Sequence, residues 1–349
     1  TISFTYTYFN HVHTVTDWND NTTTYTYFDN GAIKTINYPS GLLVEYTYYN
    51  TGWLKDVKWN GNTLTYEYYK DGSLKKVIYP NGIIEFYKYD WDKAGVLQLA
   101  YTKNTITNEY ISYYGYQYNE FGELIKDAYK EPLSQIPDFL AGITNYEYDD
   151  YNHIQQSGNV PISMDINGNR KSKGNETFHF GFFDELLQIK VNGATRYAYR
   201  YDMNGIRRKA VRNGEVSKYV YGLGDNELEE NLKGTNIQYI WGLGMVARIK
   251  DGKTHFYHSD LRGSVIAMTN SSGEITHKYA YGPYGQVLES QEPENDQNRY
   301  RFMGRYGVTY EKEDLYFVHA RFYDPTTGRF ISEDPIWNTN LFSYAGGQP

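Results

Sequence analysis

A tyrosine pair with one residue between its members, Tyr-x-Tyr, recurs about every twenty residues in the N-terminal part of the chain. The first tyrosine of each pair falls at Tyr25, Tyr46, Tyr66 and Tyr87, so the steps are 21, 20 and 21 residues. Such a short, fixed period is typical of proteins built from one supersecondary unit, because each unit buries its apolar face only against its neighbours. The repeat therefore constrains the fold more than any single motif does.

Each repeat has the pattern of one β-hairpin. An alternating stretch such as residues 22–27 leads to Asn or Asp close to a glycine, and a second alternating stretch such as residues 32–37 follows. Alternation with a period of two predicts a strand with two different faces. Asn or Asp beside Gly supplies the positive φ angles that tight turns need. We therefore predict consecutive antiparallel hairpins of about 20 residues each.

The same pattern continues, less regularly, along the rest of the chain. Further aromatic pairs are Tyr116/Tyr118, Tyr146/Tyr148, Phe178/Phe180, Tyr199/Tyr201, Tyr219/Tyr221, Tyr239/Trp241 and Tyr279/Tyr281. Two stretches break the pattern. Residues 134–142, SQIPDFLAG, are expected to form a short helix or an insertion, and residues 290–298, SQEPENDQN, an acidic loop.

Tyrosine supplies much of the apolar area of this chain. The sequence has 40 Tyr, 16 Phe and 6 Trp, while its mean hydropathy is only -0.71. A tyrosine ring packs like an apolar group and its hydroxyl finds a polar partner or water. Lone hairpins are marginal in water, whereas hairpins side by side share a sheet. We predict an all-β fold in which antiparallel hairpins form one long, curled sheet, with one face bordering water or a large internal space.

Composition excludes several function classes. The chain has no cysteine, so disulfides, thiolate chemistry and Cys-ligated zinc are excluded. Its net charge of -8 argues against nucleic acid and anionic membranes as partners. It has no run of 18 apolar residues, so no membrane span is expected. The first residues, TISFTYTYFN, lack the pattern of a signal peptide and are typical of the middle of a strand, so we expect a piece of a longer protein.

The pattern Tyr-x-Tyr-Asp/Asn-x-x-Gly-x-Leu, with its spacing near 20, resembles the YD repeats of the rearrangement-hotspot (RHS) family. The C-terminal part is similar to the RHS-associated core domain, and this resemblance is the more specific of the two. The matching pieces are Tyr257 to Val287, Phe302-x-Gly304, Leu315-Tyr316, Ala320-Arg321-x-Tyr323-Asp324-Pro325, Gly328-Arg329-Phe330, Asp334-Pro335, and Asn340-Leu341 with Tyr344.

This resemblance implies a fold and a function. RHS and YD-repeat chains, which include the C components of insecticidal toxin complexes and the teneurins, wind such hairpins into a hollow shell. Residues 1–256 would be a YD-repeat shell segment, and residues 257–349 a core domain that closes the shell. The implied function is encapsulation and delivery of a C-terminal toxin or effector by a secreted or cell-surface bacterial protein. The implied partners are that cargo, further YD repeats of the same polypeptide or of a companion shell subunit, and a secretion apparatus. A cell-surface adhesion or carbohydrate-binding module is the alternative.

A third interpretation is an enzyme that cuts its own tail once. Aspartic-protease chemistry needs two carboxylates close enough to share a proton. Asp324 and Asp334 lie ten residues apart around a predicted turn, and Arg321 could hold one of them ionised. The alternative is that both Asp-Pro pairs form turns and that the arginine is structural. Two positions depart from the family pattern, since Phe322 stands where toxin-complex relatives have an acidic residue and Trp337 where a glycine is usual.

Other motifs favour structural roles. His258, Ser259 and Asp260 are consecutive, so on a strand they face alternate sides and cannot converge as a triad; a turn with Gly263 at its corner is expected. Residues 165–176 partly match a calcium loop but have Arg170 at the position that requires glycine. A histidine pair at positions 11 and 13 lacks a third ligand. The regular tyrosines favour a ladder between hairpins over a sugar-binding platform. We predict no cofactor and no metal.

Overall fold

The computed structural model describes residues 2–133, 144–334 and 340–344. These residues form β-strands joined by turns, with two short 3₁₀ segments, η1 (Trp91–Lys93) and η2 (Gly304–Tyr306). The expected helix or insertion at residues 134–142 lies outside the described residues. No helix in the described part has the length and apolar character needed to cross a membrane.

The strands form three antiparallel sheets in which every strand pairs with its neighbours in sequence. The first sheet contains β1 (Ser3–Tyr6), β2 (Val12–Thr16), β3 (Thr22–Tyr27), β4 (Ile33–Asn37), β5 (Leu43–Tyr48), β6 (Leu54–Trp59), β7 (Asn62–Tyr68), β8 (Leu74–Ile78), β9 (Ile83–Asp90), β10 (Val96–Asn104), β11 (Tyr110–Tyr118) and β12 (Leu124–Lys130).

The second sheet begins after the gap in the described residues. It contains β13 (Tyr146–Tyr148), β14 (Ile154–Ser157), β15 (Val160–Met164), β16 (Arg170–Lys173), β17 (Glu176–Phe180), β18 (Leu186–Val191), β19 (Ala194–Tyr201), β20 (Arg207–Arg212), β21 (Glu215–Tyr221), β22 (Glu227–Leu232), β23 (Thr235–Gly242), β24 (Gly244–Lys250), β25 (Lys253–Ser259), β26 (Val265–Thr269), β27 (Ile275–Tyr281) and β28 (Val287–Gln291). The third sheet contains β29 (Thr309–Lys312), β30 (Leu315–Val318), β31 (Arg321–Asp324) and β32 (Arg329–Phe330).

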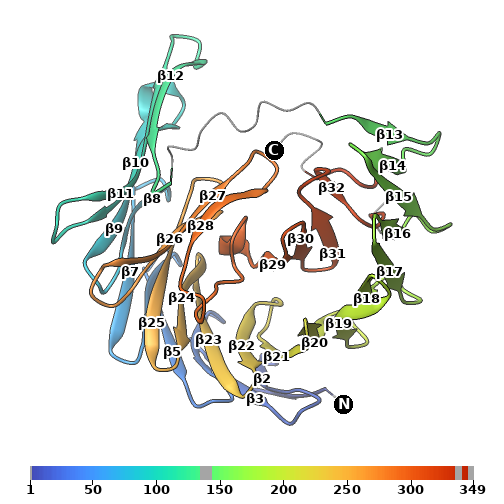
Figure 1. Ribbon diagram of the computed structural model, residues 1–349. Helices are drawn as coiled ribbons and strands as arrows, with labels where there is room; N and C mark the ends of the chain where they lie inside the picture. The colour runs from blue at the N-terminus through green and yellow to red at the C-terminus, as the bar shows by residue number, and fades with distance from the viewer. Residues whose placement is uncertain (1, 134–143, 335–339, 345–349) are drawn as a thin grey trace.

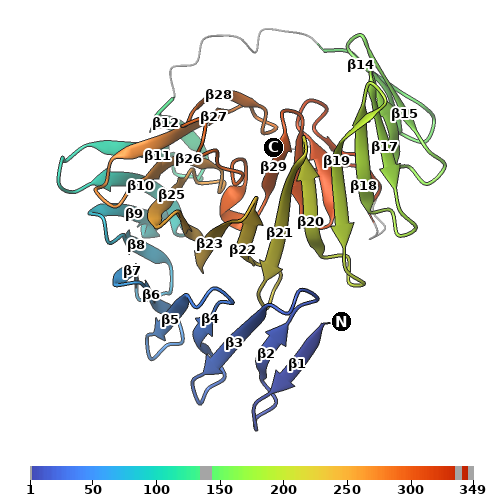
Figure 2. The same ribbon diagram turned by 60° about the horizontal axis from the view of Figure 1, so that its bottom comes forward.

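The second sheet curves around the third. Figure 1 shows β13 to β28 following a wide arc, with β29 to β32 inside it and the first sheet on the outside of its C-terminal half. In Figure 2 the first strands of the chain, β1 to β5, form a band below β21 to β23. Neither large sheet closes on itself, because each runs in order from its first strand to its last. The prediction of an all-β fold of curled antiparallel hairpins is confirmed.

The second tyrosine of each pair ties its hairpin to the preceding one. The hydroxyls of Tyr27, Tyr48, Tyr68 and Tyr89 donate to the first carbonyl of β2, β4, β6 and β8, over 2.7, 3.0, 2.8 and 3.1 Å. The expected ladder therefore exists, but its ring contacts differ from the prediction. These rings do not stack on equivalent rings. Tyr48, Tyr68 and Tyr89 each meet edge-on the aromatic residue that follows the second tyrosine of the preceding repeat, as Tyr68 meets Tyr49 at 6.0 Å.

Asp or Asn recurs in the turn after each tyrosine pair because its side chain accepts hydrogen bonds from backbone amides of the turn. In the turn after β19, Asp202 Oδ1 accepts hydrogen bonds from Asn204 N and Ile206 N, over 2.9 and 3.0 Å. Gly205 follows with φ 78°, which only glycine adopts without strain. The carboxylate thus satisfies two turn amides that strand pairing leaves free.

The first sheet has one buried and one exposed face, as alternation predicted. In β5 the buried residues Val44 and Tyr46 alternate with the exposed residues Leu43 and Glu45. The buried face packs against β22 to β27 of the second sheet and forms the largest apolar core. The first tyrosine of a pair belongs to this face, because Tyr25 and Tyr66 accept hydrogen bonds from Leu223 N and Leu243 N across the interface.

The prediction of a single sheet with one wet face is wrong for this part of the chain. The hairpins form two large sheets, and all the residues of β26 are buried. The first sheet covers one face of β26, where Asn81 donates a hydrogen bond to the hydroxyl of Thr269. The residues of β26 read Val-Ile-Ala-Met-Thr, a continuous apolar run that is typical of strands covered on both faces. The expected boundary at residue 257 lies within β25, and the large sheet continues to β28.

Candidate functional site

Arg321 and Asp334, two of the three candidate residues, lie together. Arg321 begins β31, and its Nη2 lies 2.7 Å from Asp334 Oδ2. Its guanidinium also stacks on Phe330, 3.7 Å from the ring centre, and its Nη1 donates to the carbonyl of Leu341 over 3.1 Å. Burial lowers the pKa of Arg321 below its usual value, although Asp334 opposes this shift. The pair is thus held by contacts on both sides.

This pair borders a pocket of about 550 Å³. The opposite wall comes from the turns after β15, β17 and β19. Asn169, Asp184 and Asp202 line the pocket on the side of these turns. Arg321, Glu333 and Asp334 line the other side. Asp334 is 28 % exposed, so a peptide segment could reach its carboxylate.

Asp324, the third candidate, lies in a different environment. It is completely buried, and its Oδ2 lies 2.6 Å from Arg170 Nη1 and 2.9 Å from Lys173 Nζ, both on β16. Its Oδ1 accepts hydrogen bonds from the amide and hydroxyl of Thr326. Burial alone would raise the pKa of Asp324, but Arg170 and Lys173 outweigh it and hold the pKa below its usual value.

The structure therefore does not bring the two aspartates into one proton-sharing pair. Phe322 packs in a core with β17 to β21, whereas Tyr323 packs in a second core around Phe302. Successive side chains of a strand face opposite sides, so Arg321 and Asp324 lie on opposite faces of β31. Each aspartate is neutralised by its own cations. What the geometry provides is one accessible Arg–Asp pair and one buried structural carboxylate.

The motifs that were expected to be structural form turns or core contacts. Asp260 N donates to Ser264 O over 2.8 Å with Gly263 at φ 95°, which confirms the predicted turn. The buried ring of His258 lies 2.8 Å from the hydroxyl of Thr269.

The partial calcium loop and the histidine pair also have contacts of their own. Asp165 accepts from the amides of Asn167 and Asn169 and so forms a repeat turn. His13 contacts the carbonyl of Tyr25, and His11 lies against the ring of Tyr27. No cluster of His, Asp and Glu in the described ranges has the arrangement of a metal site.

Sequence reasoning missed a buried ionic network between the third sheet and the second. Glu311 of β29 lies 2.8 Å from both Arg207 and Arg212 of β20. Arg299, which precedes β29, lies 2.8 Å from Glu227 and 3.0 Å from Glu230, both on β22. The pairs join residues 69 to 104 positions apart. The signal in the sequence was the presence of arginines and glutamates in stretches that the repeat pattern predicts to be strands with a buried face.

The environments of these carboxylates differ. Burial would raise the pKa of Glu311, but Arg207 and Arg212 lower it to about 2. Burial raises the pKa of Glu227 to about 7, because Arg299 compensates only in part and Glu230 repels its charge. For Glu230, the charges of Arg299 and Arg212 outweigh the effect of burial and lower the pKa. The network therefore holds the third sheet by at least two firmly ionised carboxylates.

A second missed junction joins all three parts of the molecule. Glu85 of β9 is buried and accepts hydrogen bonds from Tyr79 and Tyr87, over 2.7 and 3.0 Å. Arg305 of η2 donates to the carbonyl of Leu243 over 3.1 Å. Burial would raise the pKa of Glu85, but His258 and Arg305 hold it below its usual value. The segment after the second sheet thus contacts both large sheets.

Comparison with known proteins identifies similar chains. The sequence profile of the family described as Teneurin YD-shell matches residues 85–345. The tRNA3(Ser)-specific nuclease WapA of Bacillus spizizenii is 31 % identical over 231 residues, which are 63 % of this chain and 9 % of that protein. Teneurin-1 of Gallus gallus is 22 % identical over 284 residues, or 75 % of this chain and 10 % of that protein. The matched region thus makes up about a tenth of each of these two relatives.

A solved structure has a similar fold. The crystal structure of TcdB2-TccC3 superposes with a TM-score of 0.72 and 15 % sequence identity, covering 99 % of this chain and 23 % of that one. At this identity the likeness concerns the fold alone.

Proposed function

The chain belongs to the Teneurin YD-shell family of RHS/YD-repeat proteins, and we propose that it forms part of the β-shell of a polymorphic toxin that encloses and delivers a C-terminal effector. The observation that carries this proposal is the placement of the third sheet within the arc of the second, fastened there by the buried network around Arg299 and Glu311. A segment held inside the wall in this way is suited to close one end of the shell. In this proposal residues 1–256 serve as wall and residues 257–349 as the core domain that closes it. The closing segment is the part of this domain from Arg299 onward, because β25 to β28 still belong to the second sheet.

The similarity to WapA supports a toxin-like role, because the name of that relative describes a nuclease. The proposed partners are an effector that follows the closing segment, further YD repeats of the same polypeptide or a companion shell subunit, and a secretion apparatus. The proposed location is secreted or at the cell surface.

Protease protection tests encapsulation in the natural full-length polypeptide. Under native conditions the effector should survive trypsin for at least as long as the shell, and it should be digested rapidly once the shell is unfolded. A variant with an extended flexible linker that places the same effector outside the shell is the matched control. Equal digestion of the enclosed and external effectors would rule out enclosure.

A second proposal is self-cleavage at the pocket that contains Arg321 and Asp334, supported by the accessibility of that carboxylate. The carboxylate of Asp334 would accept the proton of the attacking group, while Arg321 holds that carboxylate in place. In the full-length polypeptide, Asp334→Asn should leave the tail uncut. Glu333→Gln, at a residue of the same pocket, is the control and should be cut normally. Normal cutting of Asp334→Asn would remove this residue from the chemistry.

Glycan binding by an adhesion module is the remaining alternative. A polar pocket of about 540 Å³ between the sheets supports it, since Asn21, Ser40, Glu229 and Asn231 line it and amides and carboxylates suit sugar hydroxyls. Binding of the isolated chain to a glycan array, lost in Asn231→Ala, would favour this function; no binding across the array would exclude it for the glycans tested.

A further inference from the structure

A row of three cations crosses neighbouring strands of the second sheet. Arg200 of β19 is paired directly with Lys209 of β20, and Lys209 is paired with Lys218 of β21. Side chains at directly paired positions lie on the same face about 5 Å apart, and like charges placed there destabilise a sheet. Arg200 and Lys218 are exposed and Lys209 is half-buried. The strand register thus places three like charges side by side, which does not favour folding.

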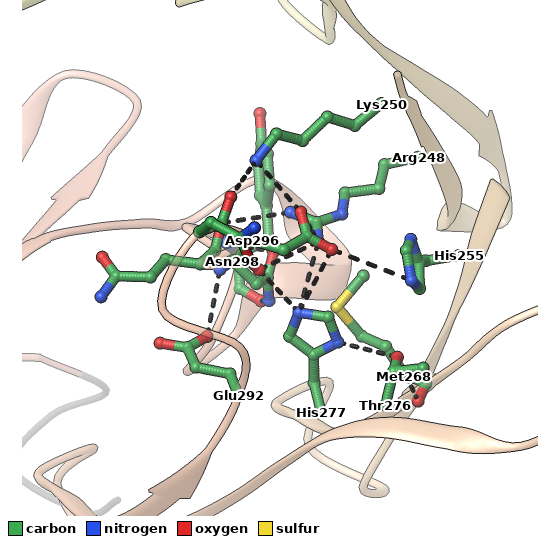
Figure 3. A network of polar contacts seen from close by, with 12 residues as sticks. Arg248, Lys250, His255, Met268, Thr276, His277, Glu292, Asp296 and Asn298 are labelled. Carbon is green, nitrogen blue, oxygen red and sulfur yellow. Dashed lines mark hydrogen bonds and ion pairs between the residues drawn. The ribbon is translucent and has the colours of Figure 1, made fainter. Parts of the chain in front are cut away.

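The three cations lack the carboxylate partners that other cations of this sheet have. Arg208 lies 2.6 Å from Asp202 Oδ2. Arg248 and Lys250 of β24 share one carboxylate, since they lie 2.8 and 3.1 Å from Asp296 Oδ1 (Figure 3). For the row, no Asp or Glu in the described part of the chain comes within ion-pair distance. Its charge is therefore uncompensated by the residues that the structure describes.

The row lies on the face of the second sheet that points away from the third sheet. Tyr199, Ala210 and Tyr219 are the strand neighbours of the three cations, and all three are buried. They belong to the same core as Phe317 and Phe322 of the third sheet. Successive side chains of a strand point to opposite faces, so the cations point away from this core. The third sheet therefore leaves the row uncovered.

Two hollows lie along the row, at the boundary with the first sheet. The first has a volume of about 510 Å³ and Lys209 in its lining, and the second has a volume of about 540 Å³ and Lys218 in its lining. The turn formed by residues 17–21 of the first sheet borders both, because Trp18 lines the first hollow and Asn19 the second. Shared borders on both sides make the two hollows neighbours, and we call them together the cationic groove.

The turn that borders the groove is held in place and presents an aromatic ring. Asp17 Oδ1 accepts hydrogen bonds from Asn19 N and Asn21 N over 2.8 and 3.0 Å, and its Oδ2 accepts from Asn21 Nδ2 over 2.9 Å. Trp18, between these bonds, is 41 % exposed. An indole has a large apolar face, against which the apolar face of a sugar ring can pack. The groove thus has a fixed aromatic wall.

The groove combines positive charge with amides. Four cations and two carboxylates line the two hollows, a net charge of +2 in a chain whose net charge is -8. Of the carboxylates, Asp202 is neutralised by Arg208, and Glu229 accepts a hydrogen bond from the backbone amide of Ser40 over 3.2 Å. An amide side chain both donates and accepts, as the hydroxyls of a sugar do. The asparagines that line the second hollow are Asn19, Asn21, Asn231 and Asn236.

We propose that the cationic groove binds an acidic polysaccharide. Its carboxylates would pair with Arg200, Lys209 and Lys218, its hydroxyls would meet the asparagines, and one sugar ring would lie on Trp18. This inference rests on the glycan-binding alternative given above and names the class of glycan. It does not depend on enclosure of an effector.

The position of the groove favours a polysaccharide over other polyanions. An acidic peptide in extended form gains most of its affinity by pairing with a free strand edge. The groove lies on a sheet face, and β19 to β23 each have a hydrogen-bonded strand on both sides. The net charge of -8 opposes the approach of a long nucleic acid, whereas the local charge of the groove suits a short run of carboxylates.

Calorimetry with oligogalacturonate and the full-length polypeptide tests the groove. Oligogalacturonate should bind at least about tenfold more tightly than its methyl ester, which keeps the sugar rings and lacks the charges. The triple variant Arg200→Gln/Lys209→Gln/Lys218→Gln should lose this preference. Its matched control, which removes the same charge at exposed lysines of β12 and of the turn after β7, should keep the preference. That control is Lys70→Gln/Lys126→Gln/Lys130→Gln.

The stability of the triple variant is a second measurement. Because like charges at paired positions repel, their removal should leave the melting temperature unchanged or raise it. A lower melting temperature would show that the row serves the fold and would overturn the proposal.

A variant of the aromatic wall separates sugar binding from charge alone. Trp18→Ala should weaken the binding of oligogalacturonate, while weak binding of an oligoglutamate with the same number of charges should not change. Tighter binding of oligoglutamate, or of a single-stranded oligonucleotide, than of oligogalacturonate would assign the row to another partner and overturn the proposal. Equal binding of the acid and its ester would also overturn it, although glycan binding as such would stand. If neither binds, the inference fails, and protease protection of an effector remains a separate result.

Discussion

The hydroxyl of Tyr66 accepts a hydrogen bond from the backbone amide of Leu243 over 3.0 Å, across the interface between the two large sheets. Tyr66 is the first tyrosine of a repeat, and Leu243 is at the tip of a turn 177 residues later. Tyr25 and Leu223 have the same relationship at 3.1 Å. The first tyrosine of a repeat therefore joins layers, while the second joins neighbouring hairpins within a layer.

The two tyrosines of one repeat should differ in their contribution to stability. Tyr66 is buried, so Tyr66→Phe removes the partner of the Leu243 amide from a part-buried hydrogen bond at a site that the phenylalanine ring still covers. The free energy of unfolding should fall by about 1–3 kcal/mol. Tyr68→Phe removes a half-buried bond to Leu54 that water can replace, so the loss should be about 0.5–1.5 kcal/mol. Urea denaturation of both variants measures the order. A larger loss in Tyr68→Phe would contradict this division of roles.

A glycine under the Tyr66 hydroxyl should be intolerant of substitution. A Cβ on Gly242 would lie well inside van der Waals contact of that oxygen, so Gly242→Ala should shift Tyr66 and lower the melting temperature by several degrees. Removal of the hydroxyl should relieve part of the clash. In a double-mutant cycle, Gly242→Ala/Tyr66→Phe should therefore cost less than the sum of the single variants, whereas strict additivity would show that the contact is unimportant.

Local structure could be predicted from the sequence because its causes are local. Tyr-x-Tyr and the Asp or Asn of each turn predicted the hairpins, since Tyr68 and Asp202 interact with residues of their own or the adjacent hairpin. The packing of the two large sheets against each other could not be predicted, because it depends on contacts between hairpins that are far apart in sequence, such as those of Tyr66 and Leu243. The same holds for the candidate site. Arg321 and Asp334 lie close in sequence, but Arg170, the partner of Asp324, is 154 residues away.

The network around Arg299 should be a major source of stability for the closing segment. Arg299→Met leaves Glu227 and Glu230 without their shared cation, and breaking a buried pair in this way costs about 3–5 kcal/mol. Lys233→Ala, which removes the exposed ion pair with Glu215, is the control and should cost about 1 kcal/mol or less. Denaturation monitored at the closing segment measures both. Similar small losses would show that the network does not hold this segment.

The pH dependence of the same network has a definite sign. Burial raises the pKa of Glu227 in the folded chain to about 7, so its contribution to stability is present below its ordinary value of about 4.3 and is lost as the pH rises through about 7. Glu227→Gln keeps the shape without the titration. Relative to the native chain, this variant should gain melting temperature between pH 5 and pH 8. A difference that stays constant with pH would show that Glu227 is ionised throughout.

Asp324 and Asp334 should be separable by stability, and this decides how a cleavage experiment is interpreted. Asp324→Asn leaves Arg170 and Lys173 facing a neutral group in the interior, so the free energy of unfolding should fall by about 3–5 kcal/mol. Asp334→Asn weakens a partly exposed pair with Arg321, and the loss should be about 1 kcal/mol or less. A folded Asp334→Asn chain that fails to cut would therefore report on chemistry, while the same failure in Asp324→Asn would report on folding. If Asp324→Asn is as stable as the native chain and alone abolishes cutting, the two assignments must be exchanged.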